Sequence, residues 1–182
     1  QLDFTKKRIF SAGLNEKVDI KFLDYRDLKG KYDSIASIEM IEAVGEKYLD
    51  KYFSTIKENL KPGGIGAIQS IIIRDELFER YRKNEDFIQK YIFPGGFLPS
   101  LHSIKDHCKK SGLELTGYNS YGSHYSNTLK EWRGNFAESW NDISKQGFDL
   151  SFKKIWNFYF SYCEAGFKSK NIDLIQFSLS NK

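Results

Sequence analysis

Two periods of hydrophobic and polar positions alternate along the chain. Alternating or short buried apolar runs predict strands at residues 18–24, 32–38, 65–73, 113–121 and 171–180. Apolar positions at helical spacing predict helices at residues 2–13, 49–60, 76–92, 100–110, 125–143 and 150–168. Strands that alternate with helices predict an α/β domain with a mainly parallel sheet and helices on both faces.

Composition narrows the class of protein. The 182 residues suffice for one domain with a sizeable core, and the aromatic fraction of 16% excludes a disordered or fibrous chain. Lysine and arginine number 28 against 24 acids, so the net charge is +4, which suits an anionic surface without requiring one. No apolar run approaches the roughly 20 residues of a membrane span. Two distant cysteines indicate a reduced, cytosolic protein.

Two acidic segments follow predicted strands, at the end of the sheet where α/β proteins bind ligands. Glu39 and Glu42 follow strand 32–38, where a carboxylate can be a base, an orienting group or a ligand; an acid favoured by a helix dipole is the alternative. Asp24 and Tyr25 follow strand 18–24 and suit an adenine, because the ring stacks and the carboxylate accepts from the amine. An ordinary charged loop is the alternative there.

Other candidate chemistry is weaker. Cys163 lies in the apolar stripe of helix 150–168, where a lone cysteine is usually a small core residue, and Cys108 is interpreted as structural. The three histidines have no metal-ligand spacing, so no metal is expected. The chain has no GxGxxG, P-loop or GxSxG motif and no nucleic-acid motif, so no nucleic-acid partner is expected.

Four segments together resemble the cyclopropane fatty acid synthases and the related mycolic acid cyclopropane synthases. They are SIEMIEAVG at 37–45, YIFPGGFLPS at 91–100, HYSNTL at 124–129 with Trp132, and YCEAGF at 162–167. The resemblance spans nearly the whole chain. It implies a Rossmann-like class I methyltransferase fold that uses S-adenosylmethionine. The implied reaction transfers a methyl to the cis double bond of a phospholipid acyl chain, after which bicarbonate removes a proton and a cyclopropane ring closes.

The resemblance also implies roles for individual residues. In the catalytic centre, Glu42 would orient the bicarbonate, Tyr125 would donate to it and the Ile71 backbone would hold it. Gln69 stands where many members have histidine, and an amide can donate a hydrogen bond but cannot take up a proton. Cys163 would line the pocket rather than attack. The residues expected near the cofactor's adenine and ribose are Gln1, Asp24, Tyr25, Arg26 and Ile38.

One part of the family pattern is absent from this sequence. The family's N-terminal helices, its first two strands and its Gly-rich E-x-G-x-G loop have no counterpart among residues 1–182. We therefore expect one partial methyltransferase domain over 1–182, with a truncated sheet that is inactive alone. Open strand edges at 18–24 and 32–38 predict either direct closure of the sheet or, preferably, a homodimer.

The expected setting is the cytoplasm, at the inner membrane surface, with phospholipid acyl chains as substrate. Two alternatives remain open. One is a related lipid methyltransferase that gives a branched product. The other is a non-catalytic module that binds a lipid surface or a partner.

Overall fold

A computed structural model describes residues 1–182, and its centre is a four-stranded mixed sheet. The strands are β1 (Tyr32–Ile38), β2 (Leu60–Ile73), β3 (Glu114–Ser120) and β4 (Ile172–Ser180), arranged in the order β1-β2-β4-β3. Only β1 and β2 run parallel, whereas β4 is antiparallel to both β2 and β3. The expectation of a mainly parallel sheet is therefore wrong, because the C-terminal strand inserts between β2 and β3.

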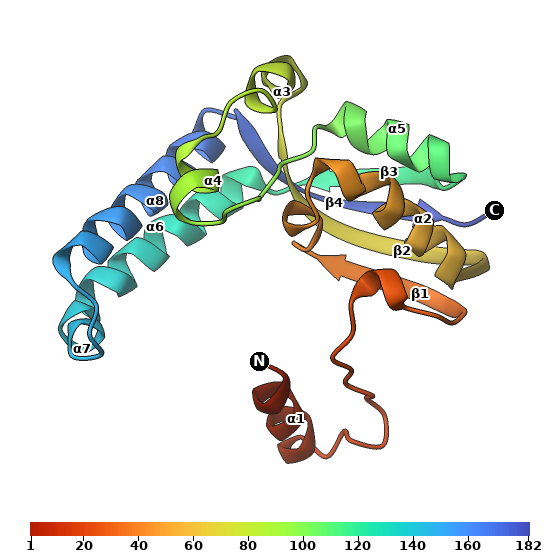
Figure 1. The fold of residues 1–182 in the computed structure, drawn as a ribbon, viewed down its shortest axis with the longest axis horizontal. Helices are drawn as coiled ribbons and strands as arrows, with labels where there is room; N and C mark the ends of the chain where they lie inside the picture. The colour runs from red at the N-terminus through yellow and green to blue at the C-terminus, as the bar shows by residue number, and fades with distance from the viewer.

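The predicted strand at 18–24 is also wrong. This segment alternates apolar and polar side chains, yet it runs outside the sheet as extended chain, and Phe22 is 93% exposed. A strand needs a neighbour for its backbone N–H and C=O groups, and nothing pairs with this segment. It links α1 (Leu2–Ser11), which stands away from the sheet in Figure 1, to a short 3-10 helix, η1 (Tyr25–Asp27).

Several predicted elements have shifted or divided bounds. Helix 76–92 is two helices, α3 (Asp75–Tyr81) and α4 (Phe87–Tyr91), and Asp86 starts the second with a capping box to Gln89. The predicted helix 125–143 divides at Ser139 into α6 (Gly122–Glu138) and α7 (Trp140–Ser144). Strand β2 begins earlier than predicted, at Leu60, directly after α2.

Other predictions are confirmed closely. The helix after Pro99 is α5 (Leu101–Ser111), which begins at a Ser100 cap and ends at Gly112 in the left-handed conformation. Helix α2 spans Leu49–Asn59, and α8 spans Leu150–Lys168 with Asp149 accepting from the Phe152 N–H. Two further 3-10 helices, η2 (Ile41–Ala43) and η3 (Glu46–Tyr48), connect β1 to α2.

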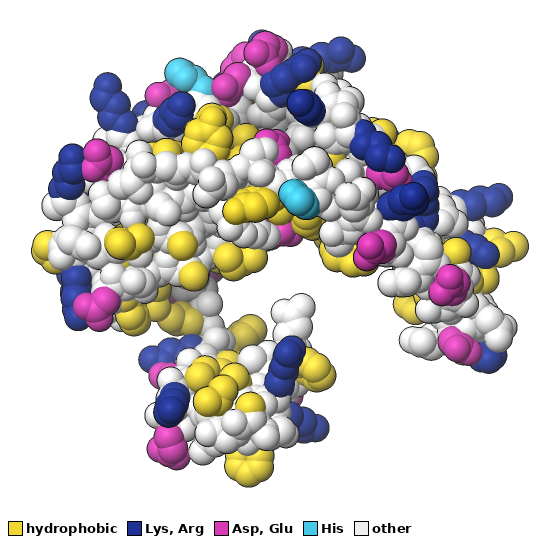
Figure 2. Space-filling view, turned by 180° about the vertical axis from the view of Figure 1, so that it is seen from behind, with side chains coloured by type: hydrophobic (Ala, Val, Ile, Leu, Met, Phe, Trp, Pro, Cys, Tyr) yellow, Lys and Arg dark blue, Asp and Glu magenta, His cyan; other side chains and the backbone are white.

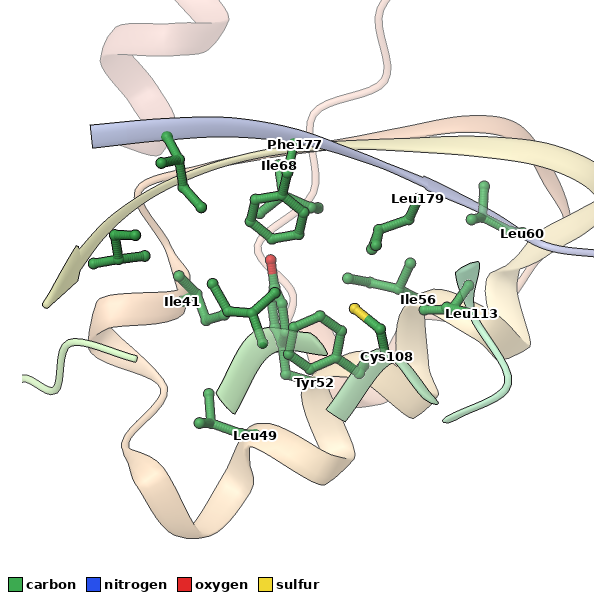
Figure 3. Close-up of a cluster of buried hydrophobic side chains, with 14 of the residues drawn as sticks. Ile41, Leu49, Tyr52, Ile56, Leu60, Ile68, Cys108, Leu113, Phe177 and Leu179 are labelled. Atoms are coloured by element: carbon green, nitrogen blue, oxygen red, sulfur yellow. The ribbon is translucent and has the colours of Figure 1, made fainter. Parts of the chain in front are cut away.

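The alternation of side chains along β2 and β4 separates two packed layers. On one face, Ile68, Phe177 and Leu179 pack against α2 and α5 in the main core (Figure 3). On the other, Leu174 packs with Leu129 of α6 and with α8 in a second cluster. Helices α6 and α8 form a long hairpin that projects from this face (Figure 1). Helices therefore cover both faces of the sheet, as predicted.

Candidate functional site

Glu39 stands at the carboxyl end of β1 in an unusual backbone conformation. Its φ of 48° is left-handed, a region that side chains other than glycine seldom adopt. The Glu39 N–H still donates to the Gln69 carbonyl at 2.9 Å, so the turn is held to β2. Strain of this kind persists where the surroundings determine the conformation, and it is common at functional sites.

The carboxylate of Glu39 is the centre of a hydrogen-bonded chain. Gln69 Nε2 donates to Glu39 Oε1 at 2.7 Å, and the Tyr125 hydroxyl donates to Oε2 at 3.3 Å. Gln176 lies directly opposite Gln69 in the β2–β4 register, and its Nε2 donates to Gln69 Oε1 at 2.7 Å. Because Gln176 occupies the Gln69 oxygen, the Gln69 amide must present its NH₂ group to Glu39.

Glu42 lies on η2 and turns its carboxyl group inward. Its Oε1 accepts from the Ile71 N–H at 2.6 Å, so in this structure the glutamate occupies the backbone donor that we expected for an anion. The Glu42 carbonyl accepts from the Phe97 N–H at 2.8 Å, which ties the turn to the loop before α5. Burial raises the pKa of Glu42, and its Oε2 is buried without a hydrogen-bond donor.

Aromatic rings and a thiol surround this polar centre from the helical hairpin. Tyr125 lies in the first turn of α6, with its ring 4.9 Å from that of Phe167 on α8. Burial, followed by the Glu39 carboxylate, raises the pKa of Tyr125, so the phenol is a neutral donor. Cys163 lies beside Tyr159, and burial raises the thiol pKa to about 12. A protonated thiol is a poor nucleophile.

Of the residues expected beside the adenine and ribose, Asp24, Tyr25 and Arg26 precede β1, Ile38 is its last residue, and Gln1 lies elsewhere. The Arg26 guanidinium and backbone N–H bind the Asp24 carboxylate and hold its pKa at about 2. Tyr25 packs edge-on against Tyr52 at 5.9 Å, and Ile38 is 62% exposed beside the polar centre. Gln1 begins α1, and Figure 1 shows this end of the chain apart from β1.

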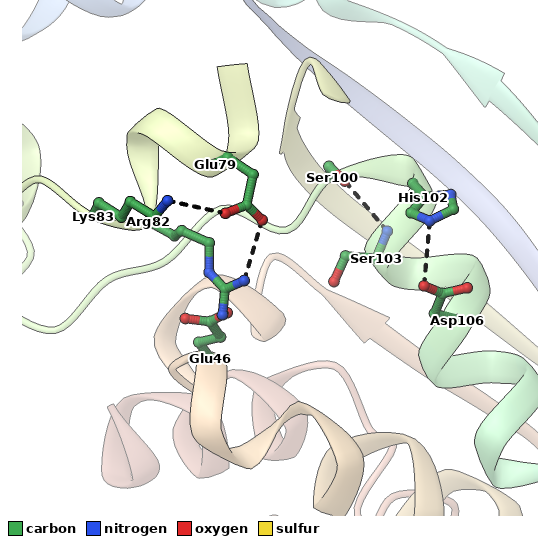
Figure 4. A network of polar contacts seen from close by, with 8 residues as sticks. All are labelled: Glu46, Glu79, Arg82, Lys83, Ser100, His102, Ser103 and Asp106. Atoms are coloured by element: carbon green, nitrogen blue, oxygen red, sulfur yellow. Dashed lines mark hydrogen bonds and ion pairs between the residues drawn. The ribbon is translucent and has the colours of Figure 1, made fainter. Parts of the chain in front are cut away.

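A hollow of about 610 Å³ lies away from these residues, between α2, α3 and α5. Its lining is charged: Arg82 pairs with Glu46 at 2.5 Å and with Glu79 at 3.2 Å, and His102 lies 3.4 Å from Asp106 (Figure 4). The opposite charges neutralise one another on an exposed surface. No buried side-chain oxygen or nitrogen of this hollow lacks a hydrogen-bond partner, whereas Glu42 Oε2 does.

Sequence reasoning identified most of the centre but missed its connections. It named Glu39 as a possible base or ligand and then assigned the catalytic role to Glu42 alone. It did not single out Gln176 or Tyr159. Gln176 is a polar residue of the alternating strand predicted at 171–180 and is exposed in the structure, so no local signal points to its partner. Nothing in the sequence gives the β2–β4 register that supplies this partner.

Comparisons with known proteins assign the chain to a family. Residues 1–177 match the family model described as mycolic acid cyclopropane synthetase. "Tuberculostearic acid methyltransferase UfaA1" of Mycobacterium tuberculosis is 39% identical over 180 residues, which are 98% of this chain and 42% of that protein. "Cyclopropane-fatty-acyl-phospholipid synthase" of Escherichia coli is 34% identical over 164 residues, which are 88% of this chain and 41% of that protein. The chain thus spans about two fifths of the length of these relatives.

The solved structures show the same fold. Mycolic acid cyclopropane synthase CmaA1, complexed with SAH and CTAB, superposes with a TM-score of 0.78 at 24% identity, covering 93% of this chain and 64% of that one. A putative sarcosine dimethylglycine methyltransferase from Galdieria sulphuraria superposes with a TM-score of 0.81 at 15% identity, covering 100% of this chain and 66% of that one. The four-stranded mixed sheet therefore corresponds to part of a methyltransferase fold. The chain belongs to the mycolic acid cyclopropane synthetase family of fatty acid methyltransferases and cyclopropane synthases.

Proposed function

We propose that the protein is an S-adenosylmethionine-dependent lipid methyltransferase that acts on the cis double bond of a phospholipid acyl chain and closes a cyclopropane ring. The observation that carries this proposal is the cluster at the ends of β1 and β2. There a carboxylate, a neutral phenol and a buried carboxyl group with an unpartnered oxygen meet beside aromatic rings and a neutral thiol. Such a setting suits a reaction that builds positive charge in an apolar pocket and then removes a proton.

The proposed position of the cofactor rests on the residues that flank β1. Asp24, Tyr25, Arg26 and Ile38 offer a carboxylate, a ring and an exposed apolar side chain, which together fit an adenine. The bound cofactor supplies a methyl group as an electrophile. Because Asp24 is already paired with Arg26 and Ile38 is open to solvent, we propose that residues 1–182 alone bind it weakly and are inactive.

The protein's own part is to hold charge and to receive a proton. The Glu39 carboxylate, fixed by Gln69 and Tyr125, stabilises a cation on the acyl chain. Gln69 cannot take up a proton, whereas Glu39, which accepts its hydrogen bond, can. We therefore place at Glu39 the proton-accepting capacity that the family pattern has in the histidine at position 69.

Bicarbonate fits the second carboxyl group. Glu42 Oε2 has no donor in its buried surroundings, so it has capacity for one further hydrogen bond, and the hydroxyl of a bicarbonate can supply it. Glu42, through Oε2, is the group that would hold such an ion, whose chemistry is to accept a proton. The Ile71 N–H and the Tyr125 hydroxyl, which donate to Glu42 Oε1 and Glu39 Oε2 in this structure, would have to exchange these partners to join it. Cys163 lines the pocket, and its thiol stays protonated.

A branched product is the second candidate. It is favoured by the 39% identity to a protein named tuberculostearic acid methyltransferase, against 34% to one named cyclopropane synthase. Both products start from the same cation: ring closure with loss of a proton gives the cyclopropane, a hydride shift with loss of a proton gives a methylene branch, and a saturated branch also needs a hydride donor. No helix in the structure combines the length and apolarity that a membrane crossing requires. We propose that the protein works at the inner surface of the membrane, where its substrate lies.

Lipid analysis tests the proposal. The protein carrying this chain is expressed in cells that make unsaturated phospholipids, and their fatty acids are examined by mass spectrometry. A gain of one CH₂ with loss of the double bond supports ring closure, whereas a saturated or methylene branch supports the second candidate. Unchanged lipids, in cells whose protein binds labelled S-adenosylmethionine, would overturn the substrate assignment. Glu39→Gln and Glu42→Gln are expected to keep cofactor binding and lose product.

A further inference from the structure

Helix α6 begins without a side-chain cap from its own segment. The residue before it is Tyr121, whose side chain accepts no hydrogen bond from the first turn. Helices α5 and α8 are capped locally, by the side chains of Ser100 and Asp149. The first N–H groups of a helix have no acceptor within the helix, so the start of α6 depends on a group from elsewhere in the chain.

That group is the carboxylate of Asp173, the second residue of β4. Its Oδ1 accepts from the Gly122 N–H at 2.8 Å, and its Oδ2 accepts from the Ser120 hydroxyl at 2.5 Å. The adjacent Leu174 carbonyl accepts from the Tyr121 N–H at 2.7 Å. A negative charge is favoured at a helix N-terminus, and a charged acceptor strengthens a hydrogen bond. These contacts together fasten the first residue of α6 to β4.

Gly122 is shaped to admit this carboxylate. It is buried, and a Cβ atom at this position would overlap Asp173 Oδ1 and lie 3.3 Å from the Asp173 Cα. Its φ is not positive, so the backbone conformation itself does not require glycine. The missing side chain therefore makes room for the carboxylate rather than permitting a turn.

The position of this helix start matters because the hairpin of α6 and α8 has a narrow base. Figures 1 and 2 show the hairpin standing out from the body of the molecule, and its main contacts with the sheet are with β4. Tyr125 lies three residues after Gly122, and its hydroxyl donates to Glu39 Oε2 at 3.3 Å, which is long for a hydroxyl donor. A small displacement of the first turn would break this bond.

We propose that Asp173 is a positioning residue, which sets the Tyr125 hydroxyl against Glu39 by fixing the N-terminus of α6. Strand β4 then places both donors to Glu39, because Gln176 orients the Gln69 amide in the same strand. The effect on turnover rests on the proposed function, whereas the placement of Tyr125 does not. Misplacing a group in an active site by 1 Å can cost about 100-fold in rate.

Fluorine NMR of the protein that carries this chain, labelled with 3-fluorotyrosine, reads the placement directly. The Tyr125 resonance is the one missing from Tyr125→Phe, and Glu39→Ala gives its chemical shift when the phenol has lost its acceptor. We expect Asp173→Ala to move the resonance toward that shift. Asp173→Asn should leave it near its original place, because an amide oxygen still accepts from the Gly122 N–H.

Gly122→Ala disturbs the same contact but keeps the carboxylate. Alanine is the better helix former, so a role in helix stability alone predicts an unperturbed α6. The added methyl group displaces Asp173, so we expect the Tyr125 resonance to move as it does in Asp173→Ala. If Asp173→Ala does not fold, as judged by circular dichroism, Gly122→Ala decides in its place.

Asp149→Ala is the matched control for the loss of a helix cap. Asp149 also accepts from a first-turn N–H at 2.8 Å, at the start of α8. Its removal should lower Tm but leave the Tyr125 resonance in place. The proposal is overturned by a resonance that stays in place in Asp173→Ala, since packing on Phe167 would then position the phenol. An equal movement in Asp149→Ala would also overturn it.

Lipid analysis separates this proposal from the proposed function. Asp173→Ala should lower the lipid product in cells at least about tenfold while labelled S-adenosylmethionine still binds, and Asp173→Asn should restore most of the product. A moved resonance with undiminished product would overturn the effect on turnover. A moved resonance in a protein that forms no lipid product, even when unsubstituted, would support the positioning role and remove only the reaction.

Discussion

The left-handed backbone at Glu39 can be tested by a pair of substitutions. Glu39→Ala and Glu39→Gly both remove the carboxylate and therefore the acceptor for Gln69 and Tyr125. Two hydrogen bonds of about 1 kcal/mol each predict a loss of about 2 kcal/mol for alanine. Glycine adopts the left-handed conformation without the penalty of about 1.5 kcal/mol that alanine incurs. Its greater conformational freedom in the unfolded state offsets about 0.5 kcal/mol of this gain in stability. Glu39→Gly should therefore be about 1 kcal/mol more stable than Glu39→Ala.

Thermal unfolding measures this difference. For a chain of this size, 1 kcal/mol corresponds to about 2–4 °C in Tm. Lys170 provides the control, since it has a φ of 57° after α8 and its side chain joins no such network. Lys170→Gly should stabilise the chain by about 1 kcal/mol. Equal stability of the alanine and glycine variants at position 39, with a gain at position 170, would refute the argument that Glu39 is strained.

Three further predictions concern the site and the sheet edge. Glu42 has a pKa raised by burial above its ordinary value of 4.5, so ionisation costs more in the folded state than in the unfolded one. The free energy of unfolding, measured in urea, should fall as the pH rises from 4.5 through the folded pKa, and Glu42→Gln should remove this component of the slope. Cys163, with a thiol pKa of about 12, should react with iodoacetamide at pH 8 far more slowly than a free cysteine, and rapid labelling in the native state would contradict its burial. Strand β1 is at the sheet edge with one side unpaired, so we expect dimers through β1 by light scattering; Ala36→Pro, which removes a backbone donor on the unpaired side, should weaken them, and a monomer at high concentration would contradict this.

The sequence predicted best those elements whose signals are local. Helix α8 combines an apolar period with an Asp149 cap, and α5 lies between a Ser100 cap and Gly112, so both were predicted nearly to the residue. Segment 18–24 shows the limit of such signals. Its alternation is that of a strand, but strand formation depends on a partner that periodicity does not specify.

The candidate site shows the same limit: the sequence identified its carboxylates but not their contacts. Glu39 and Glu42 could be found because they follow a predicted strand at the ligand-binding end of a sheet. Their different environments could not be found. Glu42 is buried against the Ile71 N–H by the shape of η2, and Glu39 is oriented by two glutamines that are 107 positions apart in the chain. These contacts follow from register and turn geometry, which only the folded structure fixes.

The pairing of Gln69 with Gln176 makes the site sensitive to changes in length rather than in residue type. Both amides lie on the face of the sheet opposite the main core, since Ile68 and Phe177, their immediate neighbours, point the other way. Inserting one residue in β2 before Gln69 would exchange the two faces and move Ile68 into the position of Gln69, and deleting one there would move Ser70 into it. Natural variation here should therefore consist of substitutions, with insertions and deletions confined to the loops.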